Sequence, residues 1–303
     1  MGKRLYEHLK SLTTEARNSR SEHLDRLDAY SILKLMNSED KTATAAVQRV
    51  LPQVAQAAEI VTASFRAGGR LIYAGAGTSG RLGVLDAAEC PPTFGVSPRM
   101  VEGIIAGGRR TLVRSREGVE DDVAAAEKDI LRLKPNGNDT VVGIAASGRT
   151  PYPLAVLKTA KRARAKTVFI VCNDLPRIPK FVDLVINPVV GPEVLTGSTR
   201  MKAGTASKMI LNMITTCSMV QIGKCYGNLM VDLKATSAKL VERSKRILTE
   251  TIGISYAQAG RLLQKAHGEV KTAIAMQLLS VDYATAKRKL QEADGKLALL
   301  IDS

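Results

Sequence analysis

Two loops of glycine and small hydroxyl residues have the composition of a phosphate-binding site. The first, Gly75–Gly80 (Gly-Ala-Gly-Thr-Ser-Gly), follows a short apolar run and opens a helical pattern, and the second, Ser147–Thr150, does the same. Backbone N–H groups at the start of a helix bind anions, and hydroxyl groups add hydrogen bonds to phosphate oxygens. The sequence therefore predicts a phosphate-binding cradle formed by Thr78, Ser79, Ser147, Gly148 and Thr150.

The first loop also fits the Gly-x-Gly-x-x-Gly pattern of dinucleotide-binding folds. Such folds need an acidic residue at the end of the second strand, where it binds a ribose hydroxyl. Here the second apolar run ends at Ile104–Ala106 and continues into Gly107–Arg110. The missing acid weighs against a nicotinamide site. A single glycine motif can also be a tight turn without a ligand, but a second loop of the same kind favours phosphate.

A third loop, Gly197–Lys202 (Gly-Ser-Thr-Arg-Met-Lys), precedes a long helical pattern rich in Ala, Met and Leu. Its Ser198 hydroxyl is a further candidate for substrate binding. Guanidinium and ammonium groups pair with a phosphate or a carboxylate, and an exposed salt bridge is the alternative for each of them. The basic candidates are Arg81, Arg149, Arg200 and Lys202.

Short apolar runs alternate with helical patterns through the middle of the chain. They lie at residues 71–74, 101–106, 140–145, 167–172 and 184–186. Continuous apolar strands that alternate with helices are typical of a parallel sheet covered on both faces, so we predict an α/β fold with a five-stranded, doubly wound parallel sheet. Ligands bind such sheets where the strand order reverses, which would bring the loops after the first and third strands together.

Helical patterns precede and follow the predicted sheet. We expect an N-terminal helical region at 1–66, the sheet domain at 67–235 and a small C-terminal module at 236–303. The module is predicted to contain three helices, near 257–265, 270–279 and 283–290, with Ser255 and Asp282 as capping residues. We expect no internal repeat.

The composition excludes several classes of protein. A chain of 303 residues, 45% apolar and 24% charged, can bury a large core without metal or disulfide support. No apolar run approaches a membrane span and the first residues lack a signal core, so we expect a soluble, cytoplasmic protein. Four scattered cysteines and three histidines argue against disulfides and zinc. The net charge of +15 is compatible with nucleic acid, but without Trp or a basic tail a small anion fits at least as well.

Three longer strings, at residues 75–95, 189–206 and 227–232, give the loops a context. The strand followed by Gly-Thr-Ser, and then the Ser-Gly-Arg-Thr loop, resembles the sugar isomerase (SIS) phosphosugar-binding fold. The serine that this fold usually has two places before Ser147 is Ala145 here. The three strings closely resemble N-acetylmuramic acid 6-phosphate etherases, and the likeness runs from about Asn37 to the C-terminal helices.

The resemblance implies an enzyme that removes D-lactate from C3 of the sugar phosphate during recycling of cell-wall muramic acid, with no metal or nucleotide cofactor. It also implies that Glu89 and Glu120 are the acid and base groups for elimination and water addition. We expect Pro91–Pro92 to stop the helix just beyond Glu89. Three neighbouring acids leave the assignment of Glu120 open: Glu117, Asp121 and Asp122.

Other functions stay open on the same fold. A non-catalytic phosphosugar sensor is the closest alternative, and the presence of Glu89 and Glu120 weighs against it. An aldose–ketose isomerase would leave the three strings unexplained. We expect a small-molecule phosphosugar as the partner, without nucleic acid or membrane. We also predict a homodimer with composite sites, because the flanking helices offer apolar faces and the resemblance implies paired SIS domains.

Overall fold

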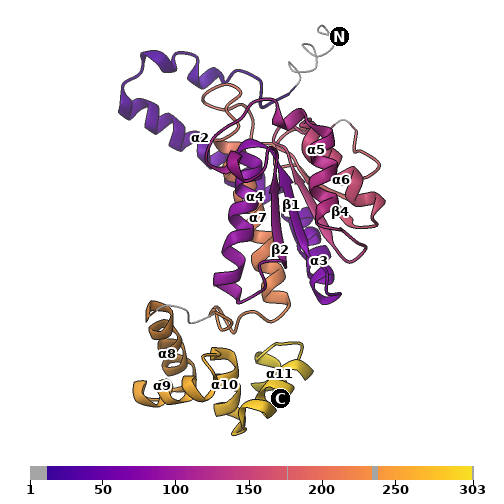
Figure 1. Ribbon diagram of the computed structural model, residues 1–303. Helices are drawn as coiled ribbons and strands as arrows, with labels where there is room; N and C mark the ends of the chain where they lie inside the picture. Colours follow the sequence, from indigo (N-terminus) through magenta and orange to yellow (C-terminus); the bar gives the residue numbers. More distant parts are fainter. Residues whose placement is uncertain (1–11, 176, 234–237, 302–303) are drawn as a thin grey trace. The chain divides into compact units, whose positions relative to one another are not determined.

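The computed structural model describes residues 12–175, 177–233 and 238–301 (Figure 1). The chain divides into a first unit, which runs up to Ala88 and from Arg99 to Thr215, and a second unit of Glu89–Pro98 and the residues from Thr216 onward. The predicted domain boundary at 235–236 lies outside the described residues, and the boundary at 66–67 stays a prediction. No helix among the described residues is long and apolar enough to cross a membrane.

Five parallel strands form one sheet in the first unit, in the order β2-β1-β3-β4-β5. They are β1 (Leu71–Gly75), β2 (Val101–Ile105), β3 (Thr140–Ile144), β4 (Lys166–Ile170) and β5 (Leu184–Ile186). β1 and β3 are buried along their whole length, as expected for central strands covered on both faces. The strand order reverses between β1 and β3. The predicted fold class and all five predicted strands are confirmed.

Helices cover both faces of this sheet (Figure 1). The helix α6 (Pro151–Arg162) packs on β1, β3 and β4 and against α5 (Val123–Arg132), while α3 (Leu51–Arg66) contacts β1, β3 and β5. The preceding helix α2 (Ala29–Arg49) begins where the Asp28 carboxylate accepts a hydrogen bond from the Ser31 N–H at 3.0 Å. The described part of the predicted N-terminal helical region is therefore helical from Ala29 onward.

The helix α4 (Gly77–Phe94) continues past the point at which the sequence predicts its end. Pro91 and Pro92 lie inside it. Each proline removes a backbone donor, but its fixed φ angle is close to the helical value, and the Pro91 carbonyl still accepts a hydrogen bond from the Gly95 N–H at 3.0 Å. The prediction that these prolines stop the helix is wrong, and Glu89 lies about one turn before its end.

The C-terminal helices of the second unit are α8 (Ala238–Ile252), α9 (Tyr256–Lys265), α10 (Val270–Leu279), α11 (Tyr283–Glu292) and α12 (Ala298–Ile301). α9, α10 and α11 are the three predicted helices, and α8 and α12 extend the module. Ser255 forms a capping box with Gln258, and the Asp282 carboxylate accepts a hydrogen bond from the Thr285 N–H at 2.8 Å. Both predicted capping residues are confirmed.

These helices contain an internal repeat, contrary to our expectation. Between residues 256 and 268, eight of thirteen recur 27 positions later: Tyr, Ala, Ala, Arg, Leu, Gln, Ala and Gly. Both copies end a ten-residue helix with two residues of positive φ, His267–Gly268 and Asp294–Gly295. The Gly268 N–H bonds the Leu263 carbonyl at 2.9 Å, and the Gly295 N–H bonds the Leu290 carbonyl at 2.7 Å. The module is therefore built from a duplicated helix and turn.

Candidate active site

The glycines of the first loop allow the start of α4 to lie against the end of β1. A Cβ atom on Gly80 would lie 2.6 Å from the Gly75 carbonyl oxygen, so only glycine fits there. The backbone N–H groups at the start of α4 thereby reach the carboxyl edge of the sheet, as an anion site requires. Thr78 and Ser79 are half-buried at this point, and no hydrogen bond joins either hydroxyl to another described residue.

The second loop follows β3 and leads into α6. Gly148 has a φ angle of +74°, which favours glycine, and the Ser147 hydroxyl accepts a hydrogen bond from the Arg149 N–H at 3.3 Å. The Arg149 Nη1 atom is buried and has no hydrogen-bond partner among the described residues. An unpaired buried guanidinium donor is costly, so an anionic acceptor at this place would stabilise it.

The three loops singled out by the sequence lie together at the carboxyl edge of the sheet. A Cβ on Gly204, in the first turn of α7 (Lys202–Gln221), would lie 3.5 Å from the Thr78 methyl group, so the first loop contacts the start of α7. Cys172, just after β4, joins the other two. Its N–H donates to the Ala146 carbonyl at 2.9 Å, and its Sγ lies 3.7 Å from the Ala203 carbonyl oxygen.

The third loop is held by two buried carboxylates. The Lys202 side chain is 2% exposed and its Nζ binds the Glu39 Oε2 at 2.7 Å. Glu193 accepts hydrogen bonds from the backbone N–H groups of Lys202 and Ala203, both at 3.0 Å, and so caps α7. Burial raises the pKa of Glu193. Lys202 therefore anchors the loop and does not present its charge to solvent.

Arg81, another basic candidate, also forms hydrogen bonds within the protein. Arg81 donates from Nη2 to the Thr111 carbonyl at 2.7 Å and from Nε to the Leu112 carbonyl at 3.0 Å. The Arg149 Nη1 atom and the exposed Arg200 guanidinium have no hydrogen-bond partner among the described residues, so both keep donors for a ligand. The half-buried Ser198 lies in the same loop as Arg200.

Comparisons with known proteins agree with the loop geometry. A family model described as the glucokinase regulatory protein N-terminal SIS domain matches residues 53–161. A protein of Geobacillus thermodenitrificans named N-acetylmuramic acid 6-phosphate etherase is 53% identical over 270 residues, which cover 89% of this chain and 92% of the relative. One of the same name from Shouchella clausii is 54% identical over 271 residues, with the same coverage. This chain belongs to the etherase family.

Among solved structures, the phosphoheptose isomerase GmhA from Neisseria gonorrhoeae is 16% identical, with a TM-score of 0.47 over 63% of this chain and 98% of that one.

The two carboxylates that the etherase family implies lie in different units. Glu120 is half-buried in the 3-10 turn Val119–Asp121. This turn packs against α6, the helix that follows the second loop. Its acidic neighbours Glu117, Asp121 and Asp122 are exposed, and Asp122 is occupied as the cap of α5. Glu89 is exposed on α4 within the second unit. Their catalytic roles stay predictions.

Glu39 and Glu193, which position the third loop, were not among the predicted site residues. Glu193 lies in the string at 189–206, directly after Gly191-Pro192, so its place offered a signal. Glu39 lies in an ordinary amphipathic helix pattern, and nothing near it in sequence marks it as the partner of Lys202, 163 residues away.

Proposed function

We propose that this protein cleaves the D-lactyl ether of N-acetylmuramic acid 6-phosphate, giving N-acetylglucosamine 6-phosphate and D-lactate, in the cytoplasmic recycling of cell-wall muramic acid. The observation that carries the proposal is the convergence of three loops with free hydroxyl and guanidinium groups in a chain that belongs to the etherase family.

The phosphate is bound by the N–H groups at the start of α4 and by those of the second loop before α6. The hydroxyls of Thr78, Ser79, Ser147 and Thr150 add hydrogen bonds to its oxygens. The remaining anionic end of the substrate is the lactyl carboxylate, which suits a guanidinium group because two parallel N–H donors fit two carboxylate oxygens. Arg149, whose Nη1 lacks an acceptor, and Arg200 are the groups available for it.

The reaction proceeds in two halves. Ring opening exposes an aldehyde at C1, which acidifies the C2 proton. One carboxylate removes this proton, the C3–O bond breaks, and the departing lactate oxygen takes a proton from the second carboxylic acid. Water then adds across the C2–C3 double bond, with the second group now acting as base toward water. Glu89 and Glu120 supply these two groups.

The positions of Thr78 and Glu89 along α4 support a homodimer with composite sites. Eleven residues separate them, which is about three helical turns, whereas C2 of a hexose 6-phosphate lies only a few bonds from its phosphate. The Glu89 that serves one phosphate cradle is therefore supplied by a second copy of the chain, related by a twofold axis.

The direct test is to incubate the purified protein with N-acetylmuramic acid 6-phosphate and to assay free D-lactate. We expect stoichiometric release of lactate and formation of N-acetylglucosamine 6-phosphate. A phosphosugar sensor would bind the substrate without releasing lactate, and an isomerase would convert other sugar phosphates and leave the ether intact.

Mixed dimers test the composite site. One copy carries Glu89→Gln, and the other carries Ser79→Ala together with Ser147→Ala. A hybrid dimer then combines an intact cradle with an intact Glu89 at one of its two sites, so random mixing by co-refolding should restore about a quarter of the parent activity. If each site lies within one copy, mixing yields no more than the sum of the two variants.

A further inference from the structure

The segment Leu12–Asn18, here named the N-terminal strap, is fixed to the carboxyl edge of the sheet at both ends. Near its start, Asn173 accepts hydrogen bonds from the Thr13 hydroxyl at 2.7 Å and the Thr14 N–H at 3.2 Å, and donates to the Thr14 hydroxyl at 2.9 Å. At its end, Asn18 donates to Glu39 at 3.0 Å. The side chains of Thr14 and Asn18 in this short irregular segment are thus buried and hydrogen-bonded.

These anchors connect the strap to two of the substrate-binding loops. Asn173 also donates to the carbonyl of Ala146, which directly precedes the second loop, at 3.0 Å. Glu39 is the residue that binds Lys202 at the end of the third loop. The strap therefore lies across the edge where both loops end, and its position is coupled to theirs.

Glu15 is a charged residue between the two anchors, and its carboxylate reaches the third loop. Its side chain is exposed, yet its Oε2 lies only 3.5 Å from where a Cβ on Gly197 would be, and Gly197 opens the third loop. The backbone on either side of Glu15 is fixed by buried residues, Thr14 at 0% and Asn18 at 6% exposure. The fold thus presents a carboxylate beside loops that otherwise offer hydroxyl groups and cations.

We propose that Glu15 contacts the sugar of the bound substrate and accepts a hydrogen bond from a neutral hydroxyl or acetamide N–H group. This inference rests on the proposed function. A carboxylate repels the phosphate and the lactyl carboxylate, so it suits the uncharged part of the substrate between these anionic ends. Glu15 thereby selects an N-acetyl sugar phosphate over a simple phosphate or carboxylate.

The experiment compares Glu15→Ala and Glu15→Gln with the parent and with Glu22→Ala, which removes another exposed carboxylate shortly after the strap. Glu15→Ala should lower kcat/KM for lactate release about 10- to 100-fold and weaken binding of N-acetylglucosamine 6-phosphate by a similar factor, because a hydrogen bond to a charged group is lost. Binding of inorganic phosphate and the Tm should stay at the parent values. Glu15→Gln keeps an acceptor oxygen and should recover part of the loss, and Glu22→Ala should match the parent.

Two results would overturn the inference. One is a parent-like kcat/KM for Glu15→Ala. The other is a loss of sugar phosphate binding, inorganic phosphate binding and Tm in equal proportion, since that pattern indicates a structural role for the strap. Failure of the proposed function is a separate result, because then the parent protein itself releases no lactate.

Discussion

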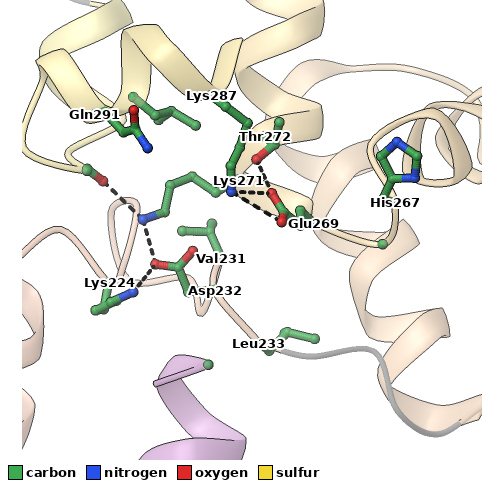
Figure 2. Close-up of a pocket in the computed structure, with 14 residues that line it drawn as sticks. Lys224, Val231, Asp232, Leu233, His267, Glu269, Lys271, Thr272, Lys287 and Gln291 are labelled. Carbon is green, nitrogen blue, oxygen red and sulfur yellow. Dashed lines mark hydrogen bonds and ion pairs between the residues drawn. The ribbon is translucent and has the colours of Figure 1, made fainter. Parts of the chain in front are cut away.

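A cavity of about 640 Å³ in the helical second unit differs from the loops of the first unit in how its charged side chains are paired. Figure 2 shows the cavity, where Lys224, Lys271 and Lys287 line the wall with Asp232 and Glu269. Each ammonium group has a carboxylate within 3.4 Å. Lys271 also donates to the carbonyls of Gly223 at 2.7 Å and Gly295 at 3.0 Å.

The loops at the sheet edge leave comparable groups unpaired. The Arg149 Nη1 is buried without an acceptor, and the hydroxyls of Thr78 and Ser79 bond no other described residue. A buried polar group normally has a partner, so an unpaired donor beside two loops with free hydroxyl groups is a candidate for binding a ligand. The state of the polar groups, and not the volume of a cavity, therefore distinguishes the candidate site from a structural pocket.

The largest effect should follow from removing the two carboxylates that we propose as the acid and base groups. Glu89→Gln and Glu120→Gln should each lower kcat for lactate release about 10²- to 10⁴-fold, the range that general acid or base groups contribute. Both side chains are partly or fully exposed, so the Tm should not change. Hydrogen exchange at C2 in D₂O separates their roles, because the variant without the base loses exchange and the variant without the acid keeps it.

Glu117→Gln, which removes an exposed acid three residues before Glu120, is the matched control and should retain parent activity. If Glu117→Gln is inactive and Glu120→Gln is active, the assignment moves by three positions. Parent-like lactate release by Glu89→Gln would remove Glu89 from the mechanism.

The sheet and the loops were predictable because their signals are local. Continuous apolar runs mark buried parallel strands, and a glycine and hydroxyl cluster after such a run marks the start of a helix at the sheet edge. The extent of α4 was not predictable in this way, since proline disfavours a helix interior without forbidding it. The repeat of Tyr256–Gly268 was visible in the sequence, but its spacing of 27 residues exceeds the window used to recognise single helices.

The partners of the site residues could not be read from the sequence. Lys202 is a basic residue in a loop of hydroxyls, a pattern typical of an anion ligand, yet its ammonium binds Glu39 from a distant helix. Arg81 likewise lies in the first glycine string but donates to the carbonyls of Thr111 and Leu112. Tertiary packing decides which of several equivalent cations meets a carboxylate, so the choice between Arg149, Arg200 and Lys202 needed the structure.

Replacing Lys271 tests the paired charges in the cavity of the second unit. Its pKa is lowered by burial, against which the Asp232 charge acts. Lys271→Ala would leave the carbonyls of Gly223 and Gly295 without this donor and Asp232 with Lys224 as its remaining ion-pair partner among the described residues. Removal of one member of a buried pair costs about 3–5 kcal/mol, so urea unfolding should show a loss of this order. The exposed Lys265→Ala on α9 is the control and should stay near the parent stability. A stable Lys271→Ala protein with weakened substrate binding would make the cavity a ligand site.

Substitutions in the phosphate cradle should weaken ligand binding without changing the stability of the protein. Ser79→Ala and Ser147→Ala each remove a hydrogen bond to a charged group, worth about 1.5–3 kcal/mol, and should weaken binding of N-acetylglucosamine 6-phosphate accordingly in calorimetric titrations. Thr249→Ala, which removes a half-buried hydroxyl on α8, is the control. Equal binding of unphosphorylated N-acetylglucosamine by the parent protein would contradict the cradle assignment.

The smallest effect is expected for the pair Glu269 and Lys287 in the cavity of the second unit. Burial raises the pKa of Glu269, but hydrogen bonds from Thr272 and Lys287 outweigh it, so the pKa is below its usual value. The unfolded chain then binds more protons on acidification, and the stability that the pair contributes is present above the unfolded pKa and is lost as the pH falls through the folded one. Both side chains are about two-fifths exposed, at 41% and 43%, and such pairs contribute only about 0.2–1 kcal/mol.

Glu269→Gln should therefore lower the free energy of unfolding slightly at pH 7. This difference from the parent should vanish in acid, and lactate release should be unchanged. Glu292→Gln on α11, where the carboxylate lies 3.8 Å from Arg288, should leave the stability unchanged. A clear loss of lactate release in Glu269→Gln at unchanged stability would show that the paired charges of this cavity take part in catalysis, against the distinction between paired and unpaired groups.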